Sequence, residues 1–247
     1  MRTFRSRLLL TLALLCPATA AFADVYDEAV TNSYRPTADH ERDAANQPAQ
    51  LMRFAGVKAG DTVLDMFAGG GYFSELLAYV VGSDGLVLMH NNLVYQGFAG
   101  EGIQTRLADG RLHNVRSLFA ELEDMGLPPQ SVDVIWLSMA YHDVYYFAEG
   151  WTVTPQTFFP ALRQVLKPDG KVIVIDHRGK TGTGSSLGNT LHRIDPEFAK
   201  ADFAAHGFRF VKETDVLENA EDDLSKSVFD PAIQGKTARF VYQFTLQ

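Results

Sequence analysis

Short apolar runs alternate with amphipathic stretches along most of the chain. Seven runs have the length and apolar content of buried strands, and they lie at residues 62–66, 86–89, 115–119, 132–137, 172–175, 208–211 and 239–245. Helical spacing of apolar residues between them predicts helices, most clearly at 72–81 and after Thr154-Pro155. This alternation predicts an α/β fold with a doubly wound, mostly parallel seven-stranded sheet covered on both faces. The last strand follows a long connection without a clear helix, so we expect it to be antiparallel.

The sharpest local feature is the junction between the first predicted strand and the first predicted helix, which reads Phe67-Ala68-Gly69-Gly70-Gly71. Glycine has no Cβ, so a ligand can lie directly against this part of the backbone. The first turn of the following helix presents free N–H groups to the same place. Asp65, at the carboxyl end of the strand, is expected to accept hydrogen bonds from the ligand. The junction therefore predicts a binding site for a nucleotide-containing cofactor.

Polar side chains also stand at the ends of other predicted strands. Ligands of such sheets bind beyond the carboxyl ends of the strands, which brings together Asp65, Asn91, His142, Asp143, Asp176 and His177. The two His/Asp pairs at adjacent strand ends predict proton transfer, because a carboxylate can orient an imidazole and raise its basicity. We take His142, Asp143, Asp176 and His177 as the candidate catalytic residues. The alternative is that each histidine only forms hydrogen bonds at the rim of the sheet.

The first 23 residues have a different pattern. Three arginines precede residue 8, an apolar core follows at 8–15, and a small-x-small motif ends at Ala23. This order is typical of a secretory signal peptide cleaved after Ala23, and it predicts export to the periplasm without a stable membrane anchor. The only cysteine, Cys16, lies in this segment, so we expect no disulfide in the exported chain.

Three regions follow from these patterns: the signal peptide at 1–23, a polar N-terminal helical cover at 24–55, and an α/β domain at 56–247. The opposite charges of the cover, at Arg35, Asp39, Arg42 and Asp43, have helical spacing, which favours a solvated face. Removing the signal peptide takes the formal net charge from −8 to −11. This negative net charge disfavours nucleic acid and acidic lipid surfaces as partners.

Three segments of the α/β domain resemble motifs of the class I S-adenosylmethionine-dependent methyltransferases. Residues 63–71 (VLDMFAGGG) resemble the first motif, 131–136 (SVDVIW) the fourth strand, and 166–171 (LKPDGK) the approach to the fifth. The chain is similar to an exported bacterial group of predicted methyltransferases with Tyr-His-Asp after the fourth strand, here 141–143, and Phe-Asp-Pro-Ala-Ile near the end, here 229–233. The resemblance implies a single Rossmann-like domain, S-adenosylmethionine as cofactor, and methyl transfer to an unidentified small molecule.

The resemblance also implies a set of cofactor-binding residues, namely Asp65, Phe67, Gly69, Gly71, Asn91 and Glu121. In the family the glycines let the methionine part of the cofactor lie on the backbone, and the position of Glu121 is an acid beside the adenine. Two positions depart from the usual motif. Phe67 replaces the first glycine, where a ring is expected to pack near the cofactor. Asn91 replaces an acid that holds both ribose hydroxyls, which is expected to weaken binding by about 1–2 kcal/mol.

Other interpretations of the same residues stay open. Asp143, Asp176 and His177 resemble in placement the magnesium ligands of catechol-type methyltransferases, but histidine is a poor magnesium ligand. A metal here would be zinc or manganese, with His192 or Asp195 as further ligands; our primary hypothesis assigns no metal. There are two alternatives to methyl transfer. The first is an exported small-molecule-binding module on the same fold, which is favoured because S-adenosylmethionine is not made in the periplasm. The second is a metal-dependent hydrolase. A nicotinamide cofactor is disfavoured, since serine occupies the third glycine position.

Two further segments bear on the substrate. Aromatic residues gather just after the fourth predicted strand, at Tyr141, Tyr145, Tyr146, Phe147 and Trp151. Such density is typical of an apolar substrate wall and also of an ordinary core corner. The long connection at 222–236 is either a lid over the pocket or a plain surface loop.

Overall fold

The chain folds around a single mixed β-sheet. The computed structural model describes residues 24–247, so the predicted signal peptide lies outside the described residues. The sheet has the strand order β3-β2-β1-β4-β5-β7-β6, with bounds β1 Thr62–Met66, β2 Leu86–Asn91, β3 Val115–Phe119, β4 Val132–Ser138, β5 Leu166–His177, β6 Phe208–Thr214 and β7 Arg239–Leu246. β7 is antiparallel to both of its neighbours, while β1 to β5 pair in parallel. The predicted fold class, including the antiparallel last strand, is confirmed.

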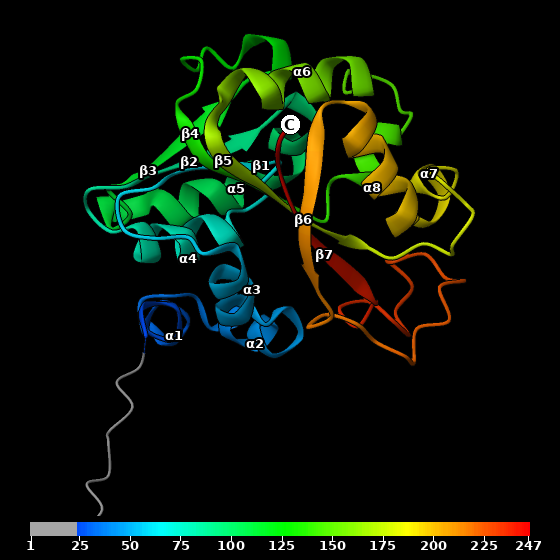
Figure 1. Cartoon of the computed structure of the whole chain (residues 1–247). Helices are drawn as coiled ribbons and strands as arrows, with labels where there is room; N and C mark the ends of the chain where they lie inside the picture. The colour runs from blue at the N-terminus through cyan, green and yellow to red at the C-terminus, as the bar shows by residue number, and fades with distance from the viewer. Residues whose placement is uncertain (1–23) are drawn as a thin grey trace, which may run out of the picture.

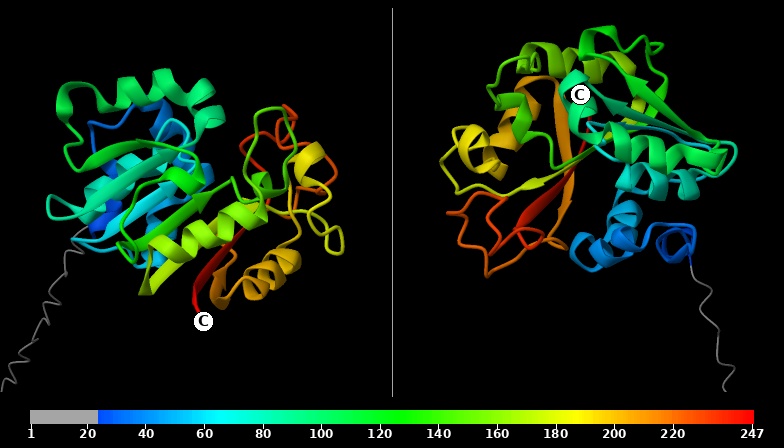
Figure 2. Two further views of the ribbon diagram at one scale, coloured as in Figure 1. Left: turned by 90° about the horizontal axis from the view of Figure 1, so that it is seen from above. Right: turned by 180° about the vertical axis from the view of Figure 1, so that it is seen from behind.

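Helices cover both faces of the sheet (Figures 1 and 2). The α-helices are α1 Val25–Thr31, α2 Thr37–Asn46, α3 Pro48–Ala55, α4 Tyr72–Val81, α5 Leu93–Leu107, α6 Pro155–Val165, α7 Gly188–Leu191 and α8 Pro196–Ala205. Short 3₁₀ turns occur at η1 Ala108–Gly110, η2 Leu122–Asp124 and η3 His142–Tyr145. Residues of α3, α4 and α5 belong to the apolar core on one face, and residues of α6 and α8 to the core on the other.

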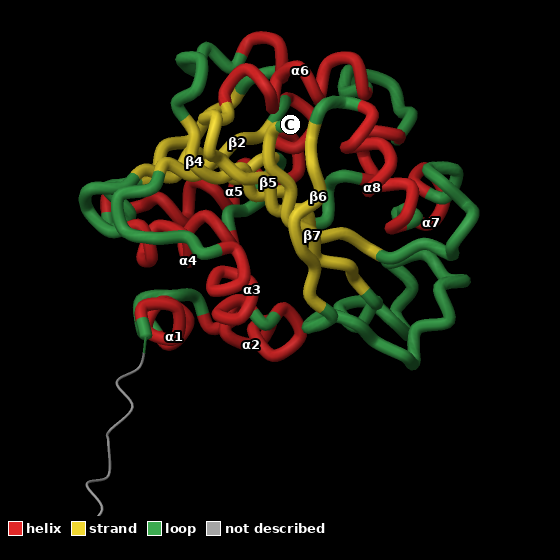
Figure 3. The backbone as a smooth tube through the Cα atoms, viewed as in Figure 1, coloured by secondary structure: helices red, strands yellow, loops and turns green. Residues whose placement is uncertain are grey.

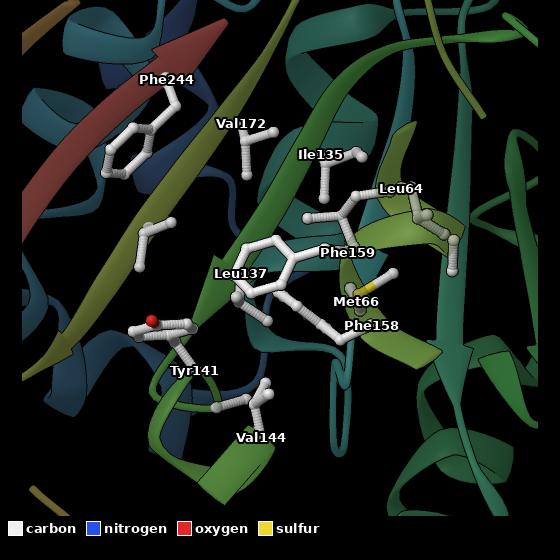
Figure 4. Packing of buried hydrophobic residues seen from close by; sticks show 14 of the residues in the cluster. Leu64, Met66, Ile135, Leu137, Tyr141, Val144, Phe158, Phe159, Val172 and Phe244 are labelled. Atoms are coloured by element: carbon white, nitrogen blue, oxygen red, sulfur yellow. The ribbon is translucent and has the colours of Figure 1, made fainter. Parts of the chain in front are cut away.

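The core beneath α6 fixes the ends of the central strands. Phe158 and Phe159 of α6 are fully buried or nearly so, and they pack in one cluster with Leu64 of β1 and with Ile135 and Leu137 of β4 (Figure 4). Burying an aromatic or branched side chain stabilises the fold by roughly 1.5–3 kcal/mol relative to leaving it exposed. The carboxyl ends of β1 and β4, where the candidate site begins, are therefore held by densely packed side chains.

Part of the charged N-terminal cover is buried, contrary to the expectation from its spacing. Arg35 and Asp39 are 4% and 5% exposed. Arg35 donates two hydrogen bonds to Asp43, at 2.7 and 2.8 Å, and the hydroxyl of Tyr72 donates to the same carboxylate at 2.6 Å. Asp39 forms an ion pair with Arg106, at 2.7 Å. Helical spacing reveals only pairs within one helix, whereas Tyr72 comes from α4 and Arg106 from α5. Because Arg106 also donates to the carbonyl of Gly70, these contacts connect α2 to the glycine turn.

The segment that joins β6 to β7, residues 215–238, contains no helix or strand (Figure 3). The buried side chains of Arg193 and Asp222 form an ion pair at 2.9 Å that fixes one part of it. The amide of Val228 donates to the carbonyl oxygen of Leu191 at 3.2 Å, which places the segment beside α7. None of the described helices combines the length and the apolar character needed to cross a membrane.

Candidate functional site

The glycine turn after β1 borders open space on one side and packed chain on the other. A Cβ added to Gly69 or Gly70 would meet no atom within 4 Å. A Cβ added to Gly71 would lie 2.5 Å from Sδ of Met89, and the φ of Gly71 is +82°. Only glycine fits this last position, because both the backbone conformation and the close packing exclude a side chain. The backbone of Gly69 and Gly70 is thus left accessible to a ligand.

Phe67 has a backbone conformation that is more usual for glycine. Its φ is +54°, in the left-handed region that costs a residue with a side chain roughly 1–2 kcal/mol. The ring is 3% exposed and packs against the rings of His90, Tyr95 and Trp151, with centroids 5.2, 5.2 and 5.9 Å away. The ring therefore belongs to an aromatic cluster at the carboxyl ends of β1 and β2.

Asp65 lies beneath the first turn of α4. It is 2% exposed and accepts a hydrogen bond from the hydroxyl of Ser74 at 2.5 Å. Burial raises the pKa of Asp65 to about 7, although the hydrogen bonds from Ser74 act in the opposite direction. Asp65 does not line the crevice at the glycine turn. Asp65 can therefore affect ligand binding only indirectly, by fixing the position of α4. A direct role of Asp65 in cofactor binding stays a prediction.

Asn91 holds the glycine turn by both ends of its amide. The side chain is fully buried, Oδ1 accepts from the amide of Gly69 at 2.9 Å, and Nδ2 donates to the carbonyl of Gly69 at 3.1 Å. A side chain at a strand end was expected to reach the ligand, but this amide bonds both the N–H and the C=O of Gly69 instead. Asn91 therefore shapes the binding backbone, and a bond to a ribose stays a prediction.

Both oxygens of Glu121 also have partners in the protein. Oε1 accepts from the amide of Leu93, the first residue of α5, at 3.1 Å, and Oε2 accepts from the hydroxyl of Thr152 at 2.6 Å. A carboxylate at a helix N-terminus is stabilised by the helix dipole. Glu121 thus joins α5 to the loop before α6, and a contact with adenine likewise stays a prediction.

The crevice beside the glycine turn has a volume of about 250 Å³. Its wall includes Arg42 of α2 and Ser138 at the end of β4. Oγ of Ser138 is buried and has no hydrogen-bond partner among the described residues. Arg42 is half exposed and lies 3.7 Å from Asp39, a long contact for an ion pair. The sequence did not indicate Arg42, because its spacing alone does not reveal that α2 packs against this turn.

A larger cavity of about 450 Å³ lies beside the crevice. Its apolar wall includes Val94, Phe98, Tyr146, Trp151, Val228 and Phe229. Tyr95 and Met139 line both hollows, so the crevice and the cavity meet at these two side chains. Tyr146 and Trp151 come from the predicted aromatic wall, and Val228 and Phe229 come from the long connection that was a possible lid. That connection does border the cavity.

His142 is the most buried polar residue of the cavity wall, at 3% exposure. Asp176, fully buried at the end of β5, accepts from the backbone amide of His142 at 2.7 Å and lies 2.8 Å from its Nδ1. Burial alone would lower the pKa of His142, but the charges of Asp176 and Asp143 outweigh it and raise the pKa. The rule that strand ends meet at one edge of the sheet thus correctly placed His142 beside Asp176.

Asp143 and His192 complete a cluster around Nε2 of His142. Oδ1 of Asp143 lies 3.2 Å from this nitrogen, and Nδ1 of His192 also lies 3.2 Å from it. The hydroxyl of Tyr95 donates to the other oxygen of Asp143 at 2.6 Å. Burial would raise the pKa of Asp143, but the bond from His192 and the charge of His142 lower it.

His177 presents a different arrangement on the same cavity. Its ring is half-buried, its Nδ1 lies 2.8 Å from the hydroxyl of Thr237, and no partner of Nε2 occurs among the described residues. Burial lowers the pKa of His177 well below its ordinary value, and the charges of His142 and Arg239 add to this effect. His177 is therefore a neutral imidazole near pH 7. Asp176 contacts its backbone amide and not its ring.

Comparisons with known proteins bear on the fold that carries these residues. Residues 64–174, from β1 into β5, match the family model of a methyltransferase domain, and no curated protein matches the chain. A solved structure of an S-adenosylmethionine-dependent methyltransferase from Aquifex aeolicus shares 21% identity with a TM-score of 0.56, over 84% of this chain and 98% of that one. Geranyl diphosphate C-methyltransferase from Streptomyces coelicolor shares 14% identity with a TM-score of 0.58, over 89% of both chains.

An arsenic(III) S-adenosylmethionine methyltransferase from Chlamydomonas reinhardtii is also similar, with 16% identity and a TM-score of 0.55 over 92% of this chain and 75% of that one. At such identities the solved structures establish a common fold. The family model adds a match to a methyltransferase domain for the segment from β1 into β5. His177 and His192 lie beyond this segment. Residues 64–174 match a methyltransferase domain, and the chain has the fold of the class I S-adenosylmethionine-dependent methyltransferases.

Proposed function

We propose that this chain transfers a methyl group from S-adenosylmethionine to an apolar, oxygen- or sulfur-bearing small molecule. The observation that supports this most is the meeting of two hollows at Tyr95 and Met139. Methyl transfer needs the donor and the acceptor side by side and in line. The glycine crevice is suited to the donor and the larger aromatic cavity to the acceptor, with the transferred group between them.

The residues of the crevice fit the amino-acid end of the cofactor. There is open space beside Gly69 and Gly70, and the hydroxyl of Ser138 is buried without a partner among the described residues. The half-exposed guanidinium of Arg42 has only a long contact with Asp39 and a place over the ring of Tyr72, so it has donors left for a carboxylate. Arg106, the other cation of the wall, already bonds the carbonyl of Gly70 and Asp39. When bound, the cofactor supplies an electrophilic methyl group on a sulfonium.

His177 is the best placed general base for the acceptor. Its Nδ1 is beside the hydroxyl of Thr237, which leaves Nε2 free to accept a proton from a ligand in the cavity. Both nitrogens of His142 already face partners, Asp176 at one and Asp143 with His192 at the other. Asp176 therefore positions His142, and we assign the proton acceptor to His177.

Calorimetric titration of S-adenosylmethionine into the full chain tests the donor site. We expect micromolar binding that Gly70→Leu abolishes, since the added side chain projects into the crevice from a backbone that tolerates it. Gly97→Leu, on the exposed surface of α5, is the matched control and should bind like the wild type. Arg42→Met should weaken binding roughly tenfold, the loss of one charge-assisted bond. Absence of heat at millimolar donor would refute the donor site.

Transfer of labelled methyl to a panel of phenols, catechols and thiols tests the acceptor site. His177→Gln should lower kcat while leaving the affinity for the donor unchanged, because Nε2 of His177 faces the acceptor cavity and not the crevice. Unchanged turnover in this variant would remove His177 from the reaction.

A second candidate function is a small-molecule-binding module that keeps the fold without methyl transfer. It is favoured by Asn91 and Glu121, whose polar atoms already bond the protein instead of pointing into the crevice. This function predicts that apolar compounds bind in the larger cavity, while the titration with the methyl donor gives no heat. The same experiment therefore decides between the two.

We propose also that the chain is exported, with cleavage after Ala23, on the basis of the signal-like pattern of residues 1–23. Fractionation followed by mass measurement of the intact protein tests this. A periplasmic species that starts at Asp24 is expected, and a full-length cytoplasmic species would contradict export.

A further inference from the structure

Three donor atoms of different side chains converge on one point at the wall of the larger cavity. Nε2 of His142 lies 3.2 Å from Oδ1 of Asp143 and 3.2 Å from Nδ1 of His192. Nδ1 of His192 lies 3.7 Å from Oδ1 of Asp143. Among the described residues this trio is the group of histidine and acidic side chains whose donor atoms lie close enough to hold one metal ion.

The separations match a tetrahedral ion better than an octahedral one. Zinc binds nitrogen and oxygen at about 2.0–2.2 Å, so two ligands of a tetrahedral site lie about 3.3–3.6 Å apart. Adjacent ligands of an octahedral site at about 2.1 Å would lie near 3.0 Å from each other. The triangle formed by the three atoms has sides of 3.2, 3.2 and 3.7 Å. A point equidistant from its corners in their plane is about 2.0 Å from each, so an ion slightly out of that plane has normal bond lengths.

The surroundings of the trio are those of a ligand set. Nδ1 of His142 faces Asp176 at 2.8 Å, an arrangement in which the carboxylate fixes the proton on Nδ1 and leaves Nε2 for a metal. Tyr95 donates to the oxygen of Asp143 that points away from the trio, at 2.6 Å. Each of these two ligands is thus oriented by a bond at its far side, as metal-binding histidines and carboxylates are in known sites.

The local charge also favours a cation. Asp143 and Asp176 are 9% and 0% exposed, and in the described part of the chain neither forms an ion pair with lysine or arginine. Their only cationic partners are histidines, whose charge depends on protonation. Two buried carboxylates without a permanent positive partner are costly. A divalent cation would neutralise the negative charges of both carboxylates.

His192 is held toward the trio by its neighbours. It follows α7 in the left-handed conformation, with a φ of +53°, which is unfavourable for a residue with a Cβ. The rings of Phe229 and Tyr146 pack against its imidazole, with centroids 4.8 and 5.2 Å away. Backbone strain of this kind is found most often where a side chain must be aimed at a functional site.

We propose that His142, Asp143 and His192 form a zinc site with its fourth position open to the larger cavity. Nitrogen and oxygen ligands in this ratio, with three protein ligands and one free position, are characteristic of catalytic zinc. The free position would take an oxygen or sulfur atom of the cavity ligand. The set differs from the one indicated by placement along the chain, Asp143, Asp176 and His177, because Asp176 instead orients His142 and His177 faces Thr237.

Metal content of the full chain, freed of metal by a chelator and then reloaded with zinc or cobalt, tests the site. We expect one zinc per chain, and with cobalt the intense visible absorption of a tetrahedral ion. His192→Gln should weaken zinc binding by more than roughly 100-fold, since loss of a residue that only orients a ligand costs 10–100-fold. His113→Gln, the same change at an exposed histidine, is the matched control and should leave affinity and spectrum unchanged.

Two results would overturn the site: no bound metal after reloading, or zinc retained at full affinity by both His192→Gln and Asp143→Asn. Circular dichroism of each variant confirms that it is folded, and His192, being partly exposed, tolerates the change best. The proposal does not depend on methyl transfer. Zinc binding is measured without the donor, and titration of the donor needs no metal, so failure of either leaves the other standing.

Discussion

Replacing Asn91 by aspartate introduces the acid that the family usually has at this position, and the structure predicts damage instead of gain. Nδ2 of Asn91 donates to the carbonyl of Gly69 at 3.1 Å in a fully buried setting. Aspartate has no donor there when ionised, so the bond is lost and a buried carbonyl faces a carboxylate. We expect a loss of about 3 kcal/mol near pH 8, the sum of a lost hydrogen bond and an unsatisfied acceptor. For a chain of this size that lowers Tm by about 6–12 °C.

The penalty should depend on pH with a definite sign. Burial beside a carbonyl raises the pKa of the introduced carboxyl in the folded state above its unfolded value. The folded variant therefore gains stability relative to the wild type as pH falls, because the protonated acid can again donate to Gly69. Thermal melts at pH 5 and pH 8 measure this, and the Tm difference from the wild type should be smaller at pH 5.

Asn92→Asp is a matched control one residue away. Asn92 is also fully buried, but its Oδ1 caps α5 by accepting from Tyr95 at 3.0 Å, and its Nδ2 has no partner in the described chain. Aspartate caps helices as well as asparagine does, so we expect a change of less than about 1 kcal/mol. An Asn91→Asp variant that has the Tm of the wild type and binds S-adenosylmethionine more tightly would refute the reasoning. Such a result would favour a hydrogen bond between residue 91 and the ribose of the cofactor.

Three further changes are measured by urea denaturation. Burial raises the pKa of Asp65 to about 7 from 3.8, so between these pH values the folded chain keeps a proton that the unfolded chain releases. The free energy of unfolding therefore falls by on the order of 4 kcal/mol as the pH rises from 3.8 to 7. Asp65→Asn should remove this slope; parallel pH profiles would contradict it. Arg106→Met leaves fully buried Glu75 with one of its two arginines. The free energy of unfolding should fall by about 3 kcal/mol; a fall below about 1 kcal/mol would show that the Arg106–Glu75 pair is dispensable. Phe67→Gly relieves roughly 1 kcal/mol of left-handed strain but loses the packing of a buried ring, worth about 3–5, so a stabilised variant would overturn this balance.

The fold could be predicted from the sequence because it depends on burial patterns that are local. Strands such as residues 132–138 are apolar on both faces, and the helix from Pro155 begins with a threonine cap and a proline. The polar residues of α2 show the limit of this approach. Asp39 and Asp43 have the spacing of a solvated helix, yet Asp39 pairs with Arg106 of α5 and Asp43 accepts a hydrogen bond from Tyr72 of α4. No local pattern predicts contacts with residues that are distant along the chain.

The candidate site was predicted in part for a similar reason. The carboxyl ends of parallel strands meet at one edge, which correctly brought His142 near Asp176. That rule places a backbone but not the direction of an amide or carboxylate, so it could not show that Asn91 turns to Gly69. His192 comes from an irregular segment after β5, where no periodicity fixes position. Its part in the cluster rests on a left-handed backbone that sequence does not reveal.

The place of β7 in the sheet has a consequence for how the chain is made. This strand lies between β5 and β6, although it follows both in the sequence. During synthesis one edge of β5 and the whole of β6 therefore stay unpaired until residues 239–246 emerge, and such edges invite pairing with other chains. Arg239, at its start, donates to Asn46 at 2.7 Å and so helps to hold α2, which carries Arg42, against the crevice. The crevice proposed to bind the donor is thus complete only after synthesis of this strand, and the nascent chain before that point is the form that we expect to be most prone to aggregation.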